Sequence, residues 1–377
     1  MVKTNEIELL RILEVIKETA VPLKNKKVTL GFDAFIDHLV KVIRHKGEAS
    51  SATYFESSLD FGQYIIDKDG KNFSIEIEDI ASKIGGNMPI TANALARSVN
   101  AVNCIGPLGY PAIHSTFKEL SNYCKLYSFG NPGFSKLLEF KTGKIILAES
   151  GKLQFITWEM IRDTIGKDTL VSLFTDTDLA VILNWGELDY STAVWKGLLN
   201  EIMLPAAGKK RSLGFFDLSD CSSRTPEQVS EALTLISAFA EYWDVTLSLN
   251  LNEAAIVFKV LTGHPAVNMD DENTAQVIFE KLGIETILIH HSKNAIAVSK
   301  KGVEKRESFF VANPLISTGA GDNFNAGYCL GRLMNLDNGA SLVLGNATAS
   351  WYMRSGCSPS LQDLQTFLTA QGQRNNS

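Results

Sequence analysis

The chain has 377 residues, of which 45% are hydrophobic and 21% are charged, so it can bury a sizeable core and is neither a disordered tail nor a disulfide-stapled miniprotein. Its formal net charge of −6 argues against a nucleic acid or an anionic membrane as its main partner. Its five cysteines are scattered without a Cys-x-x-Cys pair, and no run approaches the ~18 apolar residues that cross a bilayer. We therefore predict a cytoplasmic protein with reduced thiols.

The first predicted element is an amphipathic helix near the N-terminus, where Ile7, Leu10 and Leu13 recur at helical spacing among charged residues. Beyond it, short apolar runs of strand length alternate with amphipathic stretches of helix length. The predicted strands cover residues 28–32, 99–105, 179–183, 213–216, 245–249 and 286–289, and the predicted helices cover residues 89–98, 192–203, 226–242 and 273–282. This alternation predicts an α/β fold with a mostly parallel sheet that helices cover on both faces.

Two parts of the chain interrupt this alternation. Period-two patterns predict half-exposed antiparallel strands at residues 39–44 and 73–78, with an inserted helix at 54–66, and a hairpin around Thr142-Gly143 at residues 136–140 and 145–148. We interpret these segments as a small sheet that forms a lid, made of residues 39–79 and 136–156, on a main domain of residues 1–38 and 80–377. The alternative is surface decoration with no part in the site.

The most informative motif is Thr318-Gly319-Ala320-Gly321-Asp322, which follows an extended segment and opens a predicted helix. Its glycines let backbone N–H groups approach an anion, and the helix start adds its positive dipole end. An aspartate in the first turn of such a helix can accept a proton from a substrate hydroxyl. The alternative is a glycine turn with Asp322 as a simple helix cap.

Other signatures of phosphate, zinc and hydrolase chemistry are missing from the sequence. It contains no GxxxxGK[ST] loop, no GxGxxG opening a βαβ unit, no GxSxG elbow and no zinc-type spacing of cysteine and histidine. A P-loop enzyme, a dinucleotide dehydrogenase and a serine hydrolase are therefore excluded.

Three further groups of polar or flexible residues lie at predicted strand ends or helix starts. Gly85, Gly86 and Asn87 precede an alanine-rich helix, where a loop can approach a ligand closely. Asp33 and Asp37 follow the first strand, at the edge where open α/β sheets bind ligands. Asn250 and Glu253 follow a later strand and could hold hydrated magnesium. Each group also has a structural alternative: a tightly packed loop and helix for the glycines, and a helix cap and a surface charge for Asp33 and Asp37.

In this order, the motifs resemble the ribokinase-like (PfkB) carbohydrate kinase family from about Val28 to Ser358. The resemblance implies a three-layer α/β/α sandwich with a small β-sheet lid over the sugar site. It implies that Asp322 is the catalytic base and that Gly319, Ala320 and Gly321 form the anion hole for the phosphoryl group. The substrate-binding residues that it implies are Asp37, Gly85, Gly86 and Asn87, and the residues on the ATP side are Asn250, Glu253, Thr318 and Asn346, with Glu253 holding Mg²⁺ through water.

Two positions depart from the family pattern. Ile316 replaces the usual acid before the glycine motif, and residues 289–294 read Ile-His-His-Ser-Lys-Asn where the family has an ATP loop. The resemblance therefore leaves a monovalent-cation site open, and it implies nucleotide contacts at residues 289–294 that differ from those of the family.

The resemblance implies an ATP- and magnesium-dependent kinase for an alcohol of a sugar-like small molecule, with neither nucleic acid nor membrane as a partner. The alternatives are a nucleoside or vitamin-alcohol kinase of the same fold, and a sugar-binding protein without catalysis. The half-apolar lid also predicts a homodimer, with a monomer as the alternative.

Overall fold

The body of the molecule is a three-layer sandwich, seen in a computed structural model that describes residues 6–47, 52–149, 151–206, 211–267 and 269–374. Its central sheet has the strand order β14-β13-β12-β11-β10-β9-β1-β5-β6, and all pairs from β12 to β6 are parallel. These strands are β1 (Lys27–Gly31), β5 (Ala101–Gly106), β6 (Cys124–Ser128), β9 (Leu179–Ile182), β10 (Ser212–Asp217), β11 (Trp243–Asn250), β12 (Thr286–His290), β13 (Asn294–Ser299) and β14 (Gly302–Glu307). The predicted mostly parallel sheet is confirmed.

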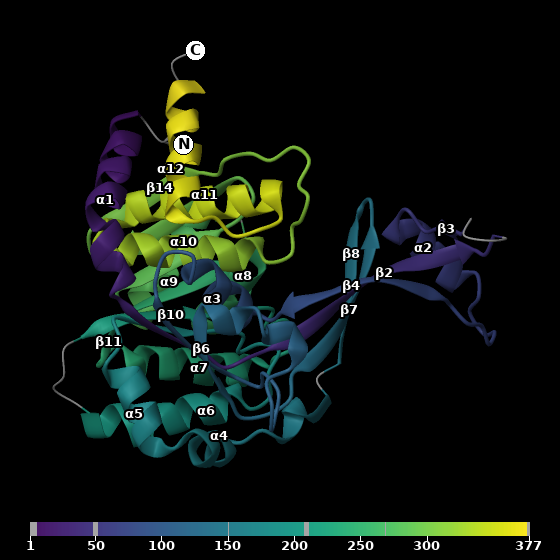
Figure 1. The fold of residues 1–377 in the computed structure, drawn as a ribbon, viewed down its shortest axis with the longest axis horizontal. Coiled ribbons are helices and arrows are strands. Elements are labelled where there is room, and N and C mark those ends of the chain that lie inside the picture. Colours follow the sequence, from purple (N-terminus) through teal and green to yellow (C-terminus); the bar gives the residue numbers. More distant parts are fainter. Residues whose placement is uncertain (1–5, 48–51, 150, 207–210, 268, 375–377) are drawn as a thin grey trace.

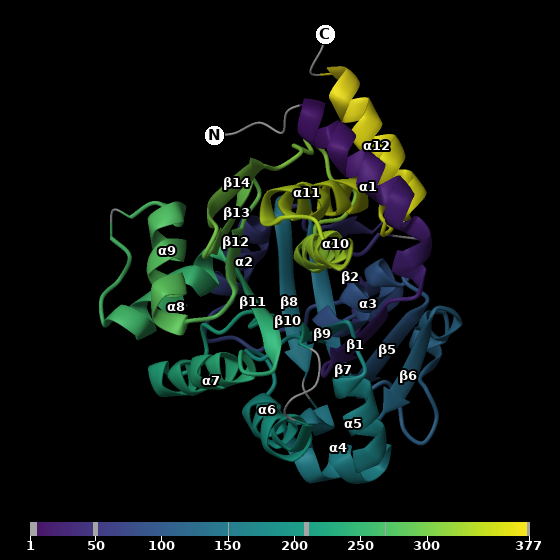
Figure 2. The ribbon, with the colours of Figure 1, turned by 90° about the vertical axis from the view of Figure 1, so that its left-hand side faces the viewer.

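Each face of the sheet packs against its own set of helices, and Figure 2 shows the two layers on either side of the strands. One core contains side chains of α1 (Glu6–Lys24), α3 (Asn87–Leu95), α10 (Ala320–Leu333), α11 (Asn338–Ser355) and α12 (Leu361–Arg374). The other contains side chains of α4 (Trp158–Ile165), α5 (Lys167–Thr175), α6 (Ser191–Gly197), α7 (Pro226–Phe239), α8 (Leu251–Thr262) and α9 (Asp271–Leu282). Because both faces are covered, a central strand such as β9 is buried at every position, as its unbroken apolar run predicts.

The lid is a second sheet that stands off the body (Figure 1). Its described strands are β2 (Phe35–His45), β3 (Thr53–Tyr54), β4 (Ile77–Gly85), β7 (Gly133–Phe140) and β8 (Gly143–Glu149). Helix α2 (Ser58–Ile66) covers one face over a small core that includes Val40, Phe61 and Leu138. The predicted inserted helix and the predicted hairpin are confirmed, whereas the domain boundaries proposed from the sequence stay a prediction.

One predicted lid strand is misplaced. The sequence predicted a strand at 73–78, but β4 begins at Ile77 and continues to Gly85. Pairing with β2 sets the position of this strand. β4 pairs antiparallel with β2 along its length, and Gly85 lies opposite Phe35, where β2 leaves the body. Residues 73–76 stay outside the strand, and among them Glu76 touches β2 only through its carbonyl, which accepts from the Ile43 N–H at 3.0 Å.

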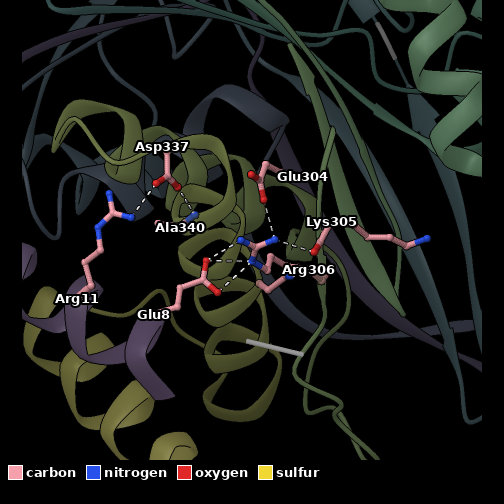
Figure 3. Close-up of polar contacts among 8 residues, drawn as sticks. Glu8, Arg11, Glu304, Lys305, Arg306, Asp337 and Ala340 are labelled. Atoms are coloured by element: carbon pink, nitrogen blue, oxygen red, sulfur yellow. Dashed lines mark hydrogen bonds and ion pairs between the residues drawn. The ribbon is translucent and has the colours of Figure 1, made fainter. Parts of the chain in front are cut away.

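Helix α1 is joined to the body by ion pairs, which Figure 3 shows. The Arg306 guanidinium of β14 donates to both carboxylate oxygens of Glu8 at 2.8–3.1 Å, and both side chains are largely buried. Arg11 pairs at 3.0 Å with Asp337, whose other oxygen caps the start of α11 by accepting from the Ala340 N–H. A first helix that sequence patterns predict only as amphipathic is therefore fixed to β14 and α11.

Two sequence-based expectations about the whole chain are also tested. The five cysteines are free thiols, as predicted. Within the described residues, no helix combines the length and the apolar character needed to cross a membrane.

Candidate active site

Polar side chains gather at the carboxyl ends of the parallel strands, beside the point where the lid leaves the body. Asp33 follows β1, Asn184 follows β9, Asp217 ends β10, Asn250 ends β11 and His290 ends β12. Ligands of open α/β sheets bind at this edge, because the connecting loops leave a crevice there.

Asp33 is the buried centre of this group. Its carboxylate accepts hydrogen bonds from the backbone N–H groups of Asn87 at 2.7 Å and Met88 at 2.8 Å, and from the Asn184 side-chain amide at 3.1 Å. It thereby satisfies the first turn of α3, which lacks intrahelical partners. Burial raises the pKa of Asp33 to about 6, although its hydrogen bonds act in the opposite direction. Asp33 thus fixes the start of α3 to the ends of β1 and β9.

Asn87 links this centre to the predicted base. Its side-chain amide donates to Asp322 at 2.9 Å, across 235 residues of sequence. Asp322 lies in the first turn of α10 and is only 8% exposed. Burial raises the pKa of Asp322 well above its usual value, and the charges of Asp217 and Asp33 act in the same direction. The carboxyl group is therefore held in one place and has an increased affinity for a proton.

The glycine pair makes room for two carboxylates. A Cβ atom at Gly85 would lie 2.2 Å from Oδ1 of Asp37, and one at Gly86 would lie 2.6 Å from Oδ2 of Asp33. Gly86 also has a backbone φ of 88°, a conformation that residues other than glycine rarely adopt. The close approach that the sequence predicts is thus present, while contact of these glycines with a sugar stays a prediction.

The loop before α10 is held by bonds to its carbonyl groups. The Tyr352 hydroxyl donates to the Thr318 carbonyl at 2.9 Å, and the Asn323 amide donates to the Gly319 carbonyl at 2.8 Å. Gly319 has φ of 85°, so the chain turns directly into the helix. The Ala320 N–H is already engaged by the Ser317 carbonyl at 3.2 Å. The first-turn N–H groups that follow have no helical partner and suit an anion.

Asn250 and Glu253 form a capping box at the start of α8. The Glu253 carboxylate accepts from the Asn250 backbone N–H at 2.9 Å and from its side-chain amide at 2.6 Å, and the Glu253 N–H donates back to the amide oxygen at 3.0 Å. Burial raises the pKa of Glu253 to about 9, and the charges of Asp217, Asp220 and Asp322 act in the same direction. The pair is both a helix cap and one side of an acidic cluster.

A cavity of about 770 Å³ opens beside the start of α10. Ala320 and Gly321 of the glycine motif line it together with the polar residues Asn250, His290 and Asn346. Its apolar walls are made by residues 309–311 and by Phe324, Ala349 and Met353. His290 stacks on Phe324 with ring centroids 4.7 Å apart, and burial lowers its pKa to about 4, so the ring is neutral. The segment that departs from the family pattern therefore forms one wall of this cavity.

Four residues of the site were not found from the sequence. Asn184 has φ of 58° and donates to Glu187 at 3.1 Å as well as to Asp33. Asp217 accepts from the Asn325 amide at 2.6 Å, and Tyr352 holds the glycine loop. Asn184, Glu187 and Asp217 occur at or just after the carboxyl ends of predicted strands, which is the signal that could have identified them. Tyr352 has no such signal, because it comes from the last turn of a long helix.

Comparison with known proteins agrees with this arrangement. The family model described as prokaryotic ketohexokinase matches residues 9–371. Ketohexokinase of Haloferax volcanii is 27% identical over 344 residues, which cover 90% of each chain.

Solved structures share the fold at low identity. Ribokinase of Thermotoga maritima has a TM-score of 0.58 at 17% identity, covering 91% of this chain and 99% of that one. A carbohydrate kinase of Agrobacterium tumefaciens has a TM-score of 0.59 at 16% identity, and the match covers 91% of this chain and 97% of that one. Adenosine kinase of Sinorhizobium meliloti has a TM-score of 0.63 at 14% identity, and the match covers 93% of this chain and 99% of that one. The predicted ribokinase-like sandwich with a lid is confirmed.

Proposed function

The chain belongs to the prokaryotic ketohexokinase family, and on this premise we propose that it transfers the γ-phosphoryl group of ATP to a hydroxyl group of a ketose. It is a carbohydrate kinase, a phosphotransferase with an alcohol as acceptor. The single observation that supports the reaction best is the buried Asp322, held by Asn87 at the start of α10 and next to the 770 Å³ cavity.

In the proposed reaction, Asp322 accepts the proton of the substrate hydroxyl as that oxygen attacks the γ-phosphorus. The Asn87 amide keeps the carboxylate in place, and its raised affinity for a proton favours the transfer. The N–H groups of Gly319, Ala320 and Gly321 are proposed to stabilise the phosphoryl group, aided by the dipole of α10. This role requires the Ala320 N–H to turn from the Ser317 carbonyl or to be shared with it. Phosphoryl transfer depends mainly on such positioning and charge stabilisation.

The nucleotide is proposed to occupy the cavity, with Asn250 and Asn346 on its polar side, while Thr318 lies just outside the residues that line it. Asn346 donates to the Glu307 carbonyl at 3.1 Å and so lies at the cavity wall. The fold of the adenosine kinase neighbour is compatible with a nucleoside kinase as well, so the fold alone does not choose between acceptors. Membership of the ketohexokinase family favours the sugar.

The acidic cluster fits a magnesium ion. Burial and the charges of Asp217 and Asp220 raise the pKa of Glu253, and a divalent cation would relieve this repulsion. Among the described residues, no group of three or more acidic, histidine or cysteine side chains is close enough to bind a metal by itself. We therefore propose that Glu253 holds Mg²⁺ through water, together with the nucleotide phosphates, whose charge the ion neutralises when bound.

The lid is proposed to cover the sugar, with Asp37 binding its hydroxyl groups, and to exclude water when it closes. The Asp37 carboxylate lies directly against Gly85, where a larger residue would displace it. A homodimer through the lid remains part of the proposal, and sedimentation of the purified protein tests it.

The test of the function is ADP release with magnesium-ATP and a panel of D-fructose, D-ribose, D-glucose and adenosine. We expect activity on the ketose and a loss of about 10²- to 10⁴-fold in kcat for Asp322→Asn, because a general base is removed. Asp168→Asn, on an exposed helix start of the body, is the matched control and should retain full activity. Activity on adenosine alone, or a fully active Asp322→Asn, would refute the proposal.

A further inference from the structure

The first turn of α3 has no capping side chain of its own. Its N-cap residue is Gly86, and a Cβ atom there would lie 2.6 Å from Oδ2 of Asp33, so no larger residue fits without displacing that carboxylate. Pro89, in the same turn, has no N–H group to satisfy. The two N–H groups that precede it both donate to the Asp33 carboxylate, at 2.7 Å and 2.8 Å. The start of this helix is therefore capped by a carboxylate from the turn after β1.

Asp33 has no surface of its own to offer a ligand. The residue is 0% exposed. All three groups that donate to its carboxylate are N–H groups, the third being the Asn184 amide at 3.1 Å. Such a set of donors fits an ionised carboxylate, which can only accept hydrogen bonds. Any effect of Asp33 on the reaction must therefore pass through its charge or through the groups that it holds.

Asn87 connects this cap to the proposed base. Its backbone N–H donates to Asp33, and its side-chain amide donates to Asp322 at 2.9 Å. Among the described residues, the amide has no other hydrogen-bond partner. The starts of α3 and α10 lie side by side, since the two helices share a core and a Cβ atom at Gly319 would lie 3.2 Å from Ile90. A shift in the start of α3 therefore moves the amide that holds the base.

We propose that Asp33 is a positioning residue of this kinase, which caps α3, thereby fixes the Asn87 amide against Asp322, and so sets kcat. The inference rests on the proposed function, since it assumes that Asp322 is the base. Asp33 acts on that base through two successive hydrogen bonds and contacts neither substrate. A displacement of about 1 Å at a reacting group is enough to lower a rate by about 10²-fold. The cap thus contributes to the rate as well as to the stability of α3.

The test is a double-mutant cycle on kcat, measured with saturating magnesium-ATP and D-fructose in wild type, Asp33→Ala, Asn87→Ala and the double variant. Asn87→Ala removes the amide but keeps the backbone N–H that Asp33 binds. Loss of the cap should therefore destabilise α3 equally in both backgrounds, which thermal unfolding of the same four proteins measures. If Asp33→Ala does not fold, the cycle is made with Asp33→Asn, which keeps the size of the side chain and one of its oxygens.

We expect Asn87→Ala and Asp33→Ala each to lower kcat by about 10- to 100-fold, as the loss of a hydrogen bond to a charged group does. In the Asn87→Ala background, removal of Asp33 should lower kcat by no more than about threefold, because only the effect of its charge is left to lose. The fall in the midpoint of thermal unfolding should be the same in both backgrounds.

Two further measurements separate positioning from a general loss of structure. The KM for ATP should stay within about twofold of wild type in Asp33→Ala, since Asp33 does not line the cavity proposed for the nucleotide. Thr157→Ala is the matched control, because Thr157 caps α4 by accepting from the Met160 N–H at 3.3 Å, outside the candidate site. It should lower the midpoint of unfolding and leave kcat unchanged.

Failure of the inference and failure of the proposed function give different results. If the losses in kcat multiply in the double variant, Asp33 does not act through Asn87 and the inference is wrong, while the kinase function stands. A folded Asp33→Ala with wild-type kcat leads to the same conclusion. If Asp322→Asn retains full activity, the base is misassigned and the proposed function itself is wrong.

Discussion

Replacing Gly85 with alanine should separate substrate binding from folding. The added Cβ would lie 2.2 Å from Oδ1 and 2.5 Å from Cγ of Asp37, whereas ordinary contacts begin at 3.4 Å. The Asp37 carboxylate must therefore retreat by about 1 Å, which is enough to break a hydrogen bond to a bound hydroxyl. Gly85 lies in a strand with ordinary backbone angles, so the substitution does not strain the main chain itself.

The size of the effect follows from the contact that is lost. A hydrogen bond to a charged group contributes about 1.5–3 kcal/mol, so kcat/KM for the sugar should fall by about 10- to 100-fold. Pushing a buried side chain aside costs about 1–3 kcal/mol of stability, which leaves the fold intact. Binding of ATP should be unchanged, because the cavity proposed for the nucleotide is not lined by Asp37 or Gly85.

Steady-state kinetics, thermal unfolding and ATP titration of the same preparation measure these three quantities. Gly62→Ala is the matched control, because Gly62 lies inside α2 of the lid with nothing within 4 Å of its added Cβ. It should be as active as wild type and slightly more stable. A folded Gly85→Ala with wild-type kcat/KM would refute the role of Asp37.

Three further substitutions test other parts of the site and its support. The pKa of Asp37 is raised from 3.8 to about 6, so the protonated form stabilises the fold below pH ~4 and this stabilisation is lost as the pH rises through 6. Urea unfolding should accordingly show Asp37→Asn to be up to about 3 kcal/mol more stable than wild type at pH 7.5 and little changed at pH 4, and equal changes at both pH values would contradict this. Gly319→Ala, at φ of 85° and 3.0 Å from the Tyr352 hydroxyl, should lower kcat by about 10²-fold through distortion of the anion site, and an unchanged kcat would show that the loop is not part of it. Glu8→Ala leaves the largely buried Arg306 charge without its main partner and should lower the free energy of unfolding, measured with denaturant, by about 3 kcal/mol. The control Glu14→Ala changes an exposed residue of the same helix and should lower it by almost nothing. Equal losses in the two variants would argue against a stabilising ion pair.

Much of the fold could be predicted because buried parallel strands have a strong local signal. The run at β9 is apolar at every position, and α7 begins with Thr225 and Pro226, a capping residue and a first-turn proline. The position of β4 could not be predicted, since pairing with β2 decides it and not the alternation of its own side chains. The boundary of an edge strand depends on a partner about 40 residues away in sequence.

The sequence predicted those residues of the candidate site that belong to a motif with a restricted backbone. It did not predict residues that come together only in the folded structure. Gly86 and Gly319 need positive φ, and the sequence shows both as glycines in recognisable motifs. Tyr352 has no distinctive neighbours in the sequence, and its proximity to Asp322 exists only after the sheet and α11 have formed. Roles in binding and proton transfer remain predictions for all the site residues.

The hydrogen bond between Asn87 and Asp322 also has a consequence for biosynthesis. It joins residues 235 positions apart, and Asp33 must meet Asn184 across 151 residues before the site is complete. A chain emerging from the ribosome can therefore build the strands around β1 long before the base arrives with α10. We expect no phosphorylating activity from nascent chains that lack α10, so the protein begins to consume ATP only when nearly all of it has been synthesised.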